Sequence, residues 1–470
     1  MKIDKFTGYI KYREEENIFI FDNYELQIIP KTYEKKLENE GTFIFENLSK
    51  PKRQGWINDI QLIGVTEKNE KVIFCIKDCA SIKNGIFKYS IKWLYIYNGP
   101  AEDQNFLIDG LTFTSQEIEQ LFNISRCIID NYNYNKETKN GNYTLNLDVT
   151  KEKIGKFKYK SHDITIYEEI NFKKKYFPQQ NLDIWPTLLL EFSDGVNDLY
   201  KLIEIVILQK HVIDFLTYRS NNTFEKITSY CYNEDHNRII SGYFYFPFDV
   251  KIEINKKNIN KLIKLTTDLN VEKLYSLIAQ DKLYIPYLSS SISERKKYTP
   301  QKMLGIFIAF EKIFGWMHSE KNTRGKKYIK MIDETIKLLN QNSQDLISKS
   351  NKKYFNEVIK NLEKSKNDIN YKSKAEYILN NYELCSKYID LIYDKNEEKS
   401  IETIATRLNI VRNALAHGNK KLEFQSINLK DMRLIEISIY IMILKYLTMD
   451  DEKIVNNISL LFNITPRYND

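Results

Sequence analysis

The first 160 residues show short apolar segments separated by polar turns. The segments are rich in β-branched and aromatic residues, and Asn-Gly pairs stand at 84–85, 98–99 and 140–141. Runs of this length and composition, bounded by turn-forming residues, are typical of β-strands. Many short strands at close spacing favour an antiparallel, sandwich-like sheet, so we expect a β-rich N-terminal domain over residues 1–160. The expected strands are 18–21, 24–29, 42–45, 60–65, 71–76 and 87–97.

Residues 161–290 mix strand-like and helix-like patterns. An apolar helix is expected from about Val196 to Leu216, with Ser193 as its N-cap. Apolar residues occur nearly all round the middle of this helix, which indicates that it is buried. We therefore expect a mixed α/β middle region. Its other expected features are strands at 164–167, 238–246 and 250–254, a break at Trp185-Pro186, and helices over 258–280.

The chain changes character after a polar segment at 289–297. Thr299-Pro300 is typical of a helix start, with Thr as the N-cap and Pro at the first helical position. The segments that follow have helical periodicity and nothing strand-like lies between them, so we expect an all-α bundle over residues 296–465. The predicted fold class is α+β multidomain. The expected helices start with one running from Pro300 through Met317, and continue at 325–341, 353–365, 373–394, 400–417, 428–448 and 453–462.

Composition narrows the classes of function. The 470 residues carry a net charge of +7, a mild excess that is compatible with a polyanionic partner. The five cysteines form no paired zinc-binding sets, so we interpret them as reduced core thiols and expect no metal. The sequence has no Walker GxxxxGK[ST], no GxGxxG after a strand and no HExxH. These absences remove the main support for ATP-driven and metal-nuclease functions, and no cofactor is expected.

The hydrophobic segments are too short to predict a membrane protein. The longest apolar run, 435–447, is interrupted by Glu436 and Lys445 and is shorter than a bilayer requires. The first residues lack the apolar region of a signal peptide. We therefore expect a soluble, cytoplasmic protein.

A compact set of polar side chains occurs late in the chain, at Arg412, Asn413 and His417. Residues 400–417 have the apolar spacing of a helix with one buried face, and Gly418 follows where a left-handed residue can end a helix. Asn413 and His417 are four residues apart and share a face, and the long Arg412 side chain can reach the same helix end. A guanidinium and an amide can bind phosphate, and an imidazole exchanges protons near neutral pH. The alternative is an exposed helix end whose terminal histidine is favoured by the helix dipole.

The segment Arg412-Asn413-x-x-x-His417 resembles the Arg-x(4–6)-His signature of HEPN domains, in particular the Apea-like subgroup. The whole chain is similar in layout to the ApeA antiphage proteins, in which a strand-rich N-terminal region precedes a C-terminal HEPN domain. The resemblance implies that Arg412, Asn413 and His417 are catalytic. Glu311 matches a polar position in the first helix of such domains, where a carboxylate would pair with Arg407 or Arg412. An ordinary solvated Glu311 is the alternative, and Arg407 is an alternative working arginine.

The activity that the resemblance implies is metal-independent endoribonuclease cleavage in abortive-infection defence. RNA carries its own nucleophile, the 2′-OH, so the products would be a 2′,3′-cyclic phosphate and a 5′-OH. HEPN domains dimerise so that two motifs face one cleft, and we expect a homodimer through the C-terminal bundle. The N-terminal region would be a sensor or regulator that responds to a phage-derived trigger. The substrate would be tRNA or mRNA, and its path would be lined by Lys420, Lys421, Lys326 and Lys327.

Two other functions remain open at this point. Some HEPN domains are non-catalytic modules that bind nucleic acid or protein, and the large N-terminal region would then do the work. A carbohydrate-binding β-sandwich with a helical dimerisation domain is a further alternative, and its signature would be clustered, exposed aromatic side chains.

Overall fold

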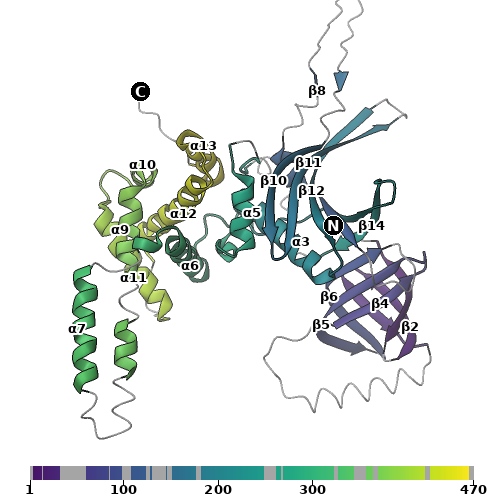
Figure 1. The fold of residues 1–470 in the computed structure, drawn as a ribbon, viewed down its shortest axis with the longest axis horizontal. Helices are drawn as coiled ribbons and strands as arrows, with labels where there is room; N and C mark the ends of the chain where they lie inside the picture. The colour runs from purple at the N-terminus through teal and green to yellow at the C-terminus, as the bar shows by residue number, and fades with distance from the viewer. Residues whose placement is uncertain are drawn as a thin grey trace, which may run out of the picture. The chain divides into compact units, whose positions relative to one another are not determined.

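Figure 1 shows the computed structural model of the chain, which has two compact units. The first unit comprises Met1–Ile213 and Asn221–Asn260, and the second comprises Asp214–Ser220 and Lys261–Asp470. The first holds the strands and the second is helical, so the chain is an α+β multidomain protein with a β-rich N-terminal region. The residues described are 4–12, 14–31, 60–83, 85–97, 107–122, 128–129, 144–145, 151–175, 181–247, 261–265, 268–321, 326–342, 356–363, 369–418 and 424–464.

The first unit is built on one sheet of twelve strands, in which every pairing is antiparallel. Its order is β10-β11-β12-β7-β13-β14-β6-β3-β2-β1-β4-β5, and β5 also pairs with β6. The expected sandwich is therefore replaced, within the described strands, by a sheet with one closed section. The strands are β1 (Phe6–Tyr12), β2 (Glu15–Asp22), β3 (Glu25–Ile29), β4 (Ile60–Thr66), β5 (Lys71–Lys83), β6 (Ile86–Tyr97), β7 (Ile108–Thr114), β10 (Lys151–Tyr159), β11 (His162–Lys175), β12 (Asn181–Val196), β13 (Lys226–Tyr232) and β14 (Arg238–Tyr245).

Strand β6 joins the closed section to the rest of the sheet. Along one edge, its first half pairs with β3 from Phe87 to Ser90, and its second half pairs with β14 from Leu94 to Tyr97. Along its other edge it pairs with β5. Six strands, β6-β3-β2-β1-β4-β5, therefore close on themselves, and the other six extend from the second half of β6.

The closed section has a continuous aromatic core. In β2 the side chains alternate between core and solvent, and the inward positions include Phe19 and Phe21. Phe74 from β5 packs against both rings, with centroids 5.2 Å and 5.7 Å away. Such contacts favour edge-to-face or tilted rings, as found here. The buried residues of this core are Ile10, Phe19, Phe21, Leu26, Ile28, Leu62, Val72, Phe74, Ile76, Phe87, Tyr89, Ile91, Leu94 and Ile96.

The expected boundary near residue 160 lies in the turn between β10 and β11. Tyr159 pairs with His162 in one hairpin, so the residues before and after this position share one sheet. The expected break at Trp185-Pro186 is wrong, because both residues pair with β11 inside β12. Here the tertiary pairing of a long strand overrides the local signal of a proline.

Helix α3 (Leu199–Thr217) matches the expected apolar helix, and all but its last turn lies in the first unit. Its expected cap is wrong: Ser193 lies in β12, and its hydroxyl donates to the Asp163 carbonyl. Asp198 is the cap instead, and its carboxylate accepts from the Tyr200 backbone N–H at 2.9 Å. The remaining elements of this unit are the short helix α2 (Gln116–Leu121) and the pair β8 (Ile128–Ile129) and β9 (Thr144–Leu145).

The second unit is helical and packs around α12. From Leu434 to Leu444 every residue of that helix is buried, and α6, α10, α11 and α13 all contact it. Thr299 caps α6 as expected, since its hydroxyl accepts from the Lys302 N–H. The helices are α5 (Val271–Ala279), α6 (Pro300–Met317), α7 (Lys326–Asn342), a helix at 356–363, α9 (Tyr371–Asn381), α10 (Glu383–Ile392), α11 (Ile401–Ala416), α12 (Ser426–Tyr446) and α13 (Asp451–Phe462).

Two expected helices of this unit are wrong in extent. Helix α5 begins at Val271, and residues 261–265 are not helical although a helix was expected over 258–280. The single helix expected over 373–394 is divided at Tyr382, which is extended. The Tyr382 hydroxyl is hydrogen-bonded to the His318 ring at 3.1 Å, a contact that no local pattern encodes. The expected strands at 42–45 and 250–254 lie outside the described residues.

A substitution of Gly8 in β1 tests how closely the strands of the closed section pack. A Cβ at this position would lie 2.7 Å from the Phe19 ring and 2.8 Å from the Thr66 Cα. We expect Gly8→Ala to lower the free energy of unfolding of this unit by about 2 kcal/mol, because the core would be overpacked. Scanning calorimetry on the whole chain measures the change.

The matched control is Gly315→Ala in α6, where a Cβ would meet nothing within 4 Å. In a helix this change should stabilise by about 0.5–1 kcal/mol. Equal effects of the two substitutions would contradict the close packing at Gly8.

Candidate functional site

Helix α11 presents Arg412, Asn413 and His417 at its C-terminal end. The helix begins at a Ser400 cap, whose hydroxyl accepts from the Thr403 backbone N–H at 3.2 Å. Ile404, Ala405, Leu408 and Val411 are its buried face. It ends at His417, and Gly418 follows with φ +63°, a left-handed conformation that glycine adopts without strain. The polar side chains therefore lie at a helix end that is fixed by the apolar face.

Arg412 is held by a carboxylate from another helix. Its Nη2 donates to Glu311 of α6, at 3.3 Å from Oε1 and 3.5 Å from Oε2. The Arg412 and Glu311 side chains are 35 % and 29 % exposed, so solvent reaches both members of the pair. Glu311 therefore orients the guanidinium, while the exposed part of that group remains accessible to a ligand. Of the two arginine partners expected for Glu311, the structure selects Arg412.

Asn413 and His417 lie beside Arg412. The Asn413 Oδ1 accepts a hydrogen bond from Arg412 Nη1 at 3.3 Å, and its backbone carbonyl accepts from the His417 N–H at 3.0 Å. Both residues are exposed, and the His417 ring makes no hydrogen bond with another described residue. The arrangement therefore combines an oriented guanidinium with an accessible imidazole five residues later, about 1.4 turns along the helix.

Tyr371 of α9 packs behind the Glu311–Arg412 pair and was not anticipated from the sequence. Its ring contacts Phe307 and Phe310 of α6, with centroids 5.1 Å and 5.2 Å away. Burial raises the pKa of its hydroxyl well above the usual value, the Glu311 carboxylate raises it further and Arg412 lowers it. Tyr371 is therefore a neutral, buried phenol close enough to the ion pair to feel both charges.

Arg407 has a different environment from Arg412. Its Nε and Nη2 donate to the two oxygens of Asp431 in α12, both at 2.7 Å, and its Nη1 donates to the Glu398 carbonyl at 3.0 Å. Asp431 is 1 % exposed and also accepts from the Tyr393 hydroxyl at 2.5 Å. Burial and the adjacent Asp431 raise the Tyr393 pKa. Arg407 therefore joins α11 to α12, and each of its three nitrogens donates to an acceptor of the protein.

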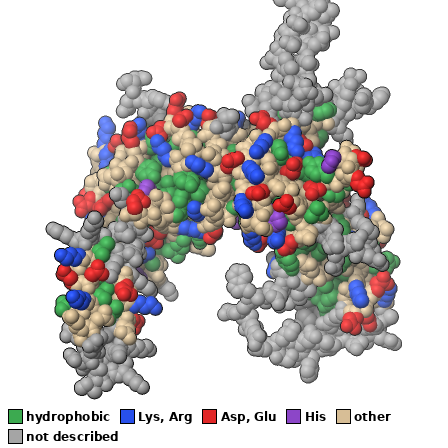
Figure 2. Space-filling view, in the orientation of Figure 1, with side chains coloured by type: hydrophobic (Ala, Val, Ile, Leu, Met, Phe, Trp, Pro, Cys, Tyr) green, Lys and Arg blue, Asp and Glu red, His purple; other side chains and the backbone are tan. Residues whose placement is uncertain are grey.

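The structure describes only two of the four lysines that we expected along an RNA path. Lys326 and Lys327 form the first turn of α7, and Lys420 and Lys421 lie outside the described residues. Figure 2 shows Lys and Arg side chains interspersed with Asp and Glu over the described surface of one face. This face therefore shows no continuous basic surface.

The described residues hold no group of three or more His, Cys, Asp or Glu that could bind a metal ion. Cys75 and Cys385 are buried and neither forms a disulfide, and burial raises the pKa of the Cys385 thiol to about 12. None of the helices in the described ranges is long and apolar enough to cross a membrane.

Comparisons with protein-family models, with curated proteins and with solved structures found no match to this chain.

The contrast between the two arginines predicts different effects on stability. Asp431→Asn removes the charge that faces Arg407 in a largely buried setting, so we expect the free energy of unfolding to fall by about 3 kcal/mol. Glu311→Gln removes the charge that faces Arg412 in a solvated pair, so the loss should stay below about 1 kcal/mol. Urea unfolding followed by circular dichroism measures both. Equal losses would contradict the assignment of Arg407, rather than Arg412, as the structural arginine.

Proposed function

We propose that this chain is a metal-independent endoribonuclease of the HEPN type. The observation that carries the proposal is the oriented but accessible Arg412, which an exposed His417 follows five residues later at the end of the same helix. The resemblance of Arg412-Asn413-x-x-x-His417 to the HEPN signature adds the reaction class. The sequence order of strands before helices is similar to ApeA antiphage proteins, which extends the proposal to antiphage defence.

The proposed reaction uses the nucleophile that RNA itself provides. The 2′-oxygen attacks the adjacent phosphorus, the bond from phosphorus to the 5′-oxygen breaks, and the products are a 2′,3′-cyclic phosphate and a 5′-OH. A base takes the 2′-OH proton and an acid donates a proton to the leaving oxygen. Proton transfer of this kind contributes about 10²- to 10⁴-fold in rate. We assign this proton transfer to His417, because its ring is exposed at the end of α11 and accessible to a substrate.

Arg412 stabilises the charge that develops on the phosphate. A guanidinium has five donors in a fixed plane, and the contacts to Glu311 at 3.3 Å and 3.5 Å use only one nitrogen. The remaining donors are suited to the phosphate oxygens of the pentacoordinate transition state. Asn413 already accepts from Arg412 Nη1, so it limits the rotation of the guanidinium plane. Glu311 and Asn413 are therefore positioning residues for Arg412.

One imidazole serves poorly as both acid and base in one step. We propose that the helical unit forms a homodimer in which His417 from each copy contributes to one composite site. In this scheme one His417 accepts the 2′-OH proton and the other protonates the leaving 5′-oxygen. The N-terminal unit would then restrain or trigger cleavage in response to a phage-derived signal, with tRNA or mRNA as substrate.

The test compares RNA cleavage by the wild-type chain and its His417→Asn and Arg412→Gln variants in the presence of EDTA. We expect each substitution to lower the rate by at least about 10²-fold, because each removes a group that acts in the transition state. The product ends should be a cyclic phosphate and a 5′-OH. Light scattering on the same samples measures the dimer.

His236→Asn is the matched control, since this second histidine is also exposed but lies in the first unit, far along the chain from the motif. It should cleave like wild type. Equal cleavage by all variants would assign the activity to another site or to contamination. Binding of RNA without cleavage, unchanged by His417→Asn, would favour the alternative of a non-catalytic HEPN binding module.

A further inference from the structure

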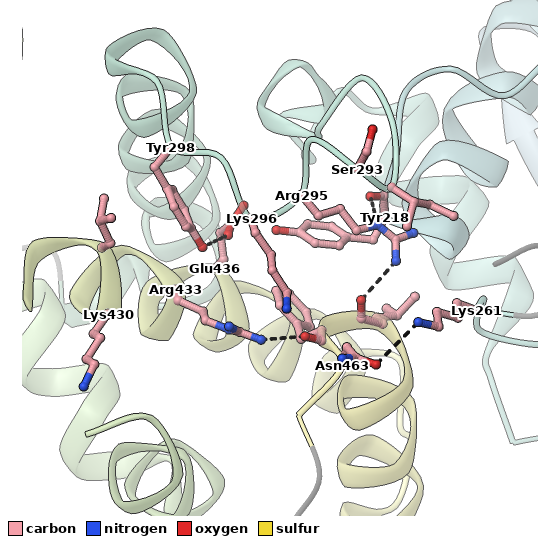
Figure 3. A pocket seen from close by; sticks show the side chains of 14 residues that line it. Tyr218, Lys261, Ser293, Arg295, Lys296, Tyr298, Lys430, Arg433, Glu436 and Asn463 are labelled. Atoms are coloured by element: carbon pink, nitrogen blue, oxygen red, sulfur yellow. Dashed lines mark hydrogen bonds between the residues drawn. The ribbon is translucent and has the colours of Figure 1, made fainter. Parts of the chain in front are cut away.

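A cavity lies within the helical unit, and none of the motif residues lines it. Its volume is about 430 Å³, within the range of sites that hold small molecules. All of its lining residues belong to the second unit, from Tyr218 and Lys261 through the segment at 292–298 to α12 and the end of α13. Figure 3 shows these side chains converging from elements that are far apart in the sequence.

The lining has an excess of positive charge. Five basic side chains and one acidic side chain contribute to it. The acidic residue, Glu436, is fully buried, accepts from the Tyr298 hydroxyl at 2.6 Å and lies 3.4 Å from the Lys302 ammonium. Its charge is therefore offset from within the protein, and the rest of the cavity is cationic.

Two of the five basic side chains that line the cavity are bound by other groups of the protein. Arg295 donates to the backbone carbonyls of Thr217, Tyr218 and Leu461, which ties together three segments of the unit. Lys430 forms ion pairs at 2.7 Å with Asp394 and with Glu397. Figure 3 shows Lys430 pointing away from the other labelled cations. Neither side chain therefore has its positive charge available to bind a ligand.

Two other cations are available. Arg433 of α12 uses one nitrogen to donate to the Phe462 carbonyl at 2.6 Å, and it has no carboxylate partner among the described residues. Lys296 is exposed and has no ion pair within the described part of the chain. Figure 3 shows both side chains directed toward the same part of the cavity, near Asn463. Within the described residues, the fifth cation, Lys261, makes a 3.4 Å contact to the Asn463 side-chain oxygen. A guanidinium and an ammonium that face one space favour a phosphate group.

The cavity also offers apolar surface beside these charges. Leu429 is 37 % exposed, and Ile292 and the Phe462 ring also line the space. We propose that this cavity binds a small phosphate ester with a flat ring, of the size of a nucleoside monophosphate. The phosphate lies against Arg433 and Lys296, and the ring lies against the apolar side chains. This site is distinct from the Arg412 site and does not depend on RNA cleavage.

The test is isothermal titration of the full chain with adenosine 5′-monophosphate, guanosine 5′-monophosphate, inorganic pyrophosphate and adenosine. We expect at least one nucleotide to bind, pyrophosphate to bind more weakly and adenosine not to bind. Lys296→Gln and Arg433→Gln should each weaken nucleotide binding by about tenfold, because each removes a charged hydrogen bond. Arg433→Gln also removes the contact of Arg433 with the Phe462 carbonyl, so circular dichroism verifies folding.

Lys430→Gln is the matched control, since it removes a lysine of the same lining whose charge is bound to Asp394 and Glu397. It should change nucleotide affinity by less than about twofold. His417→Asn should bind nucleotide as wild type does, which separates this site from the proposed nuclease. The inference is overturned by no nucleotide binding at about 1 mM, by equal affinity for pyrophosphate, or by no effect of the first two substitutions. It is also overturned if a ribo-oligonucleotide, but no mononucleotide, binds through Lys296 and Arg433.

Discussion

The geometry of the motif depends on the ion pair between Arg407 and Asp431. Two hydrogen bonds of 2.7 Å connect α11 to a helix that is buried along most of its length. A bidentate pair of this kind fixes direction as well as distance. The contact between Arg412 and Glu311 is longer and more exposed, so it adds little to the attachment of α11. One arginine of the helix therefore anchors it, and the other is left to bind a ligand.

The buried polar groups of α12 follow a common rule. Asp431 is paired with Arg407, Glu436 is bonded to Tyr298, and the Ser438 hydroxyl donates to the Leu434 carbonyl. Buried polar groups are costly unless they are paired, so each of these contacts specifies which helix lies against which part of α12. Apolar packing alone would specify less strictly which helices lie against α12.

The sequence predicts the helical unit better than it predicts the sheet. Thr299-Pro300 and Ser400 are local signals, and the helices that follow them begin where expected. Ser193 failed as a cap because it lies within β12, where its hydroxyl donates to the Asp163 carbonyl, and Asp198 caps the helix instead. The pairing of Glu311 with Arg412 joins residues that are 101 positions apart, and Tyr371 and the cavity lining are likewise assembled from distant segments. Periodicity carries no information on such contacts. The pairing of Glu311 with Arg407 or Arg412 was an expectation from the resemblance to HEPN domains, and the structure places Glu311 beside Arg412.

The shared strand β6 has a consequence for the order in which the protein is made. Its partner β14 follows it by more than a hundred residues, since Tyr97 pairs with Gly242. While the ribosome is still producing the segment between them, the second half of β6 has backbone donors and acceptors along one edge and no strand to pair with. Unpaired edges of this kind attract other chains, and long-range pairing is slow to form. The nascent protein is therefore most exposed to aggregation before residue 245 emerges, and a chaperone that covers this edge would act during synthesis rather than after it.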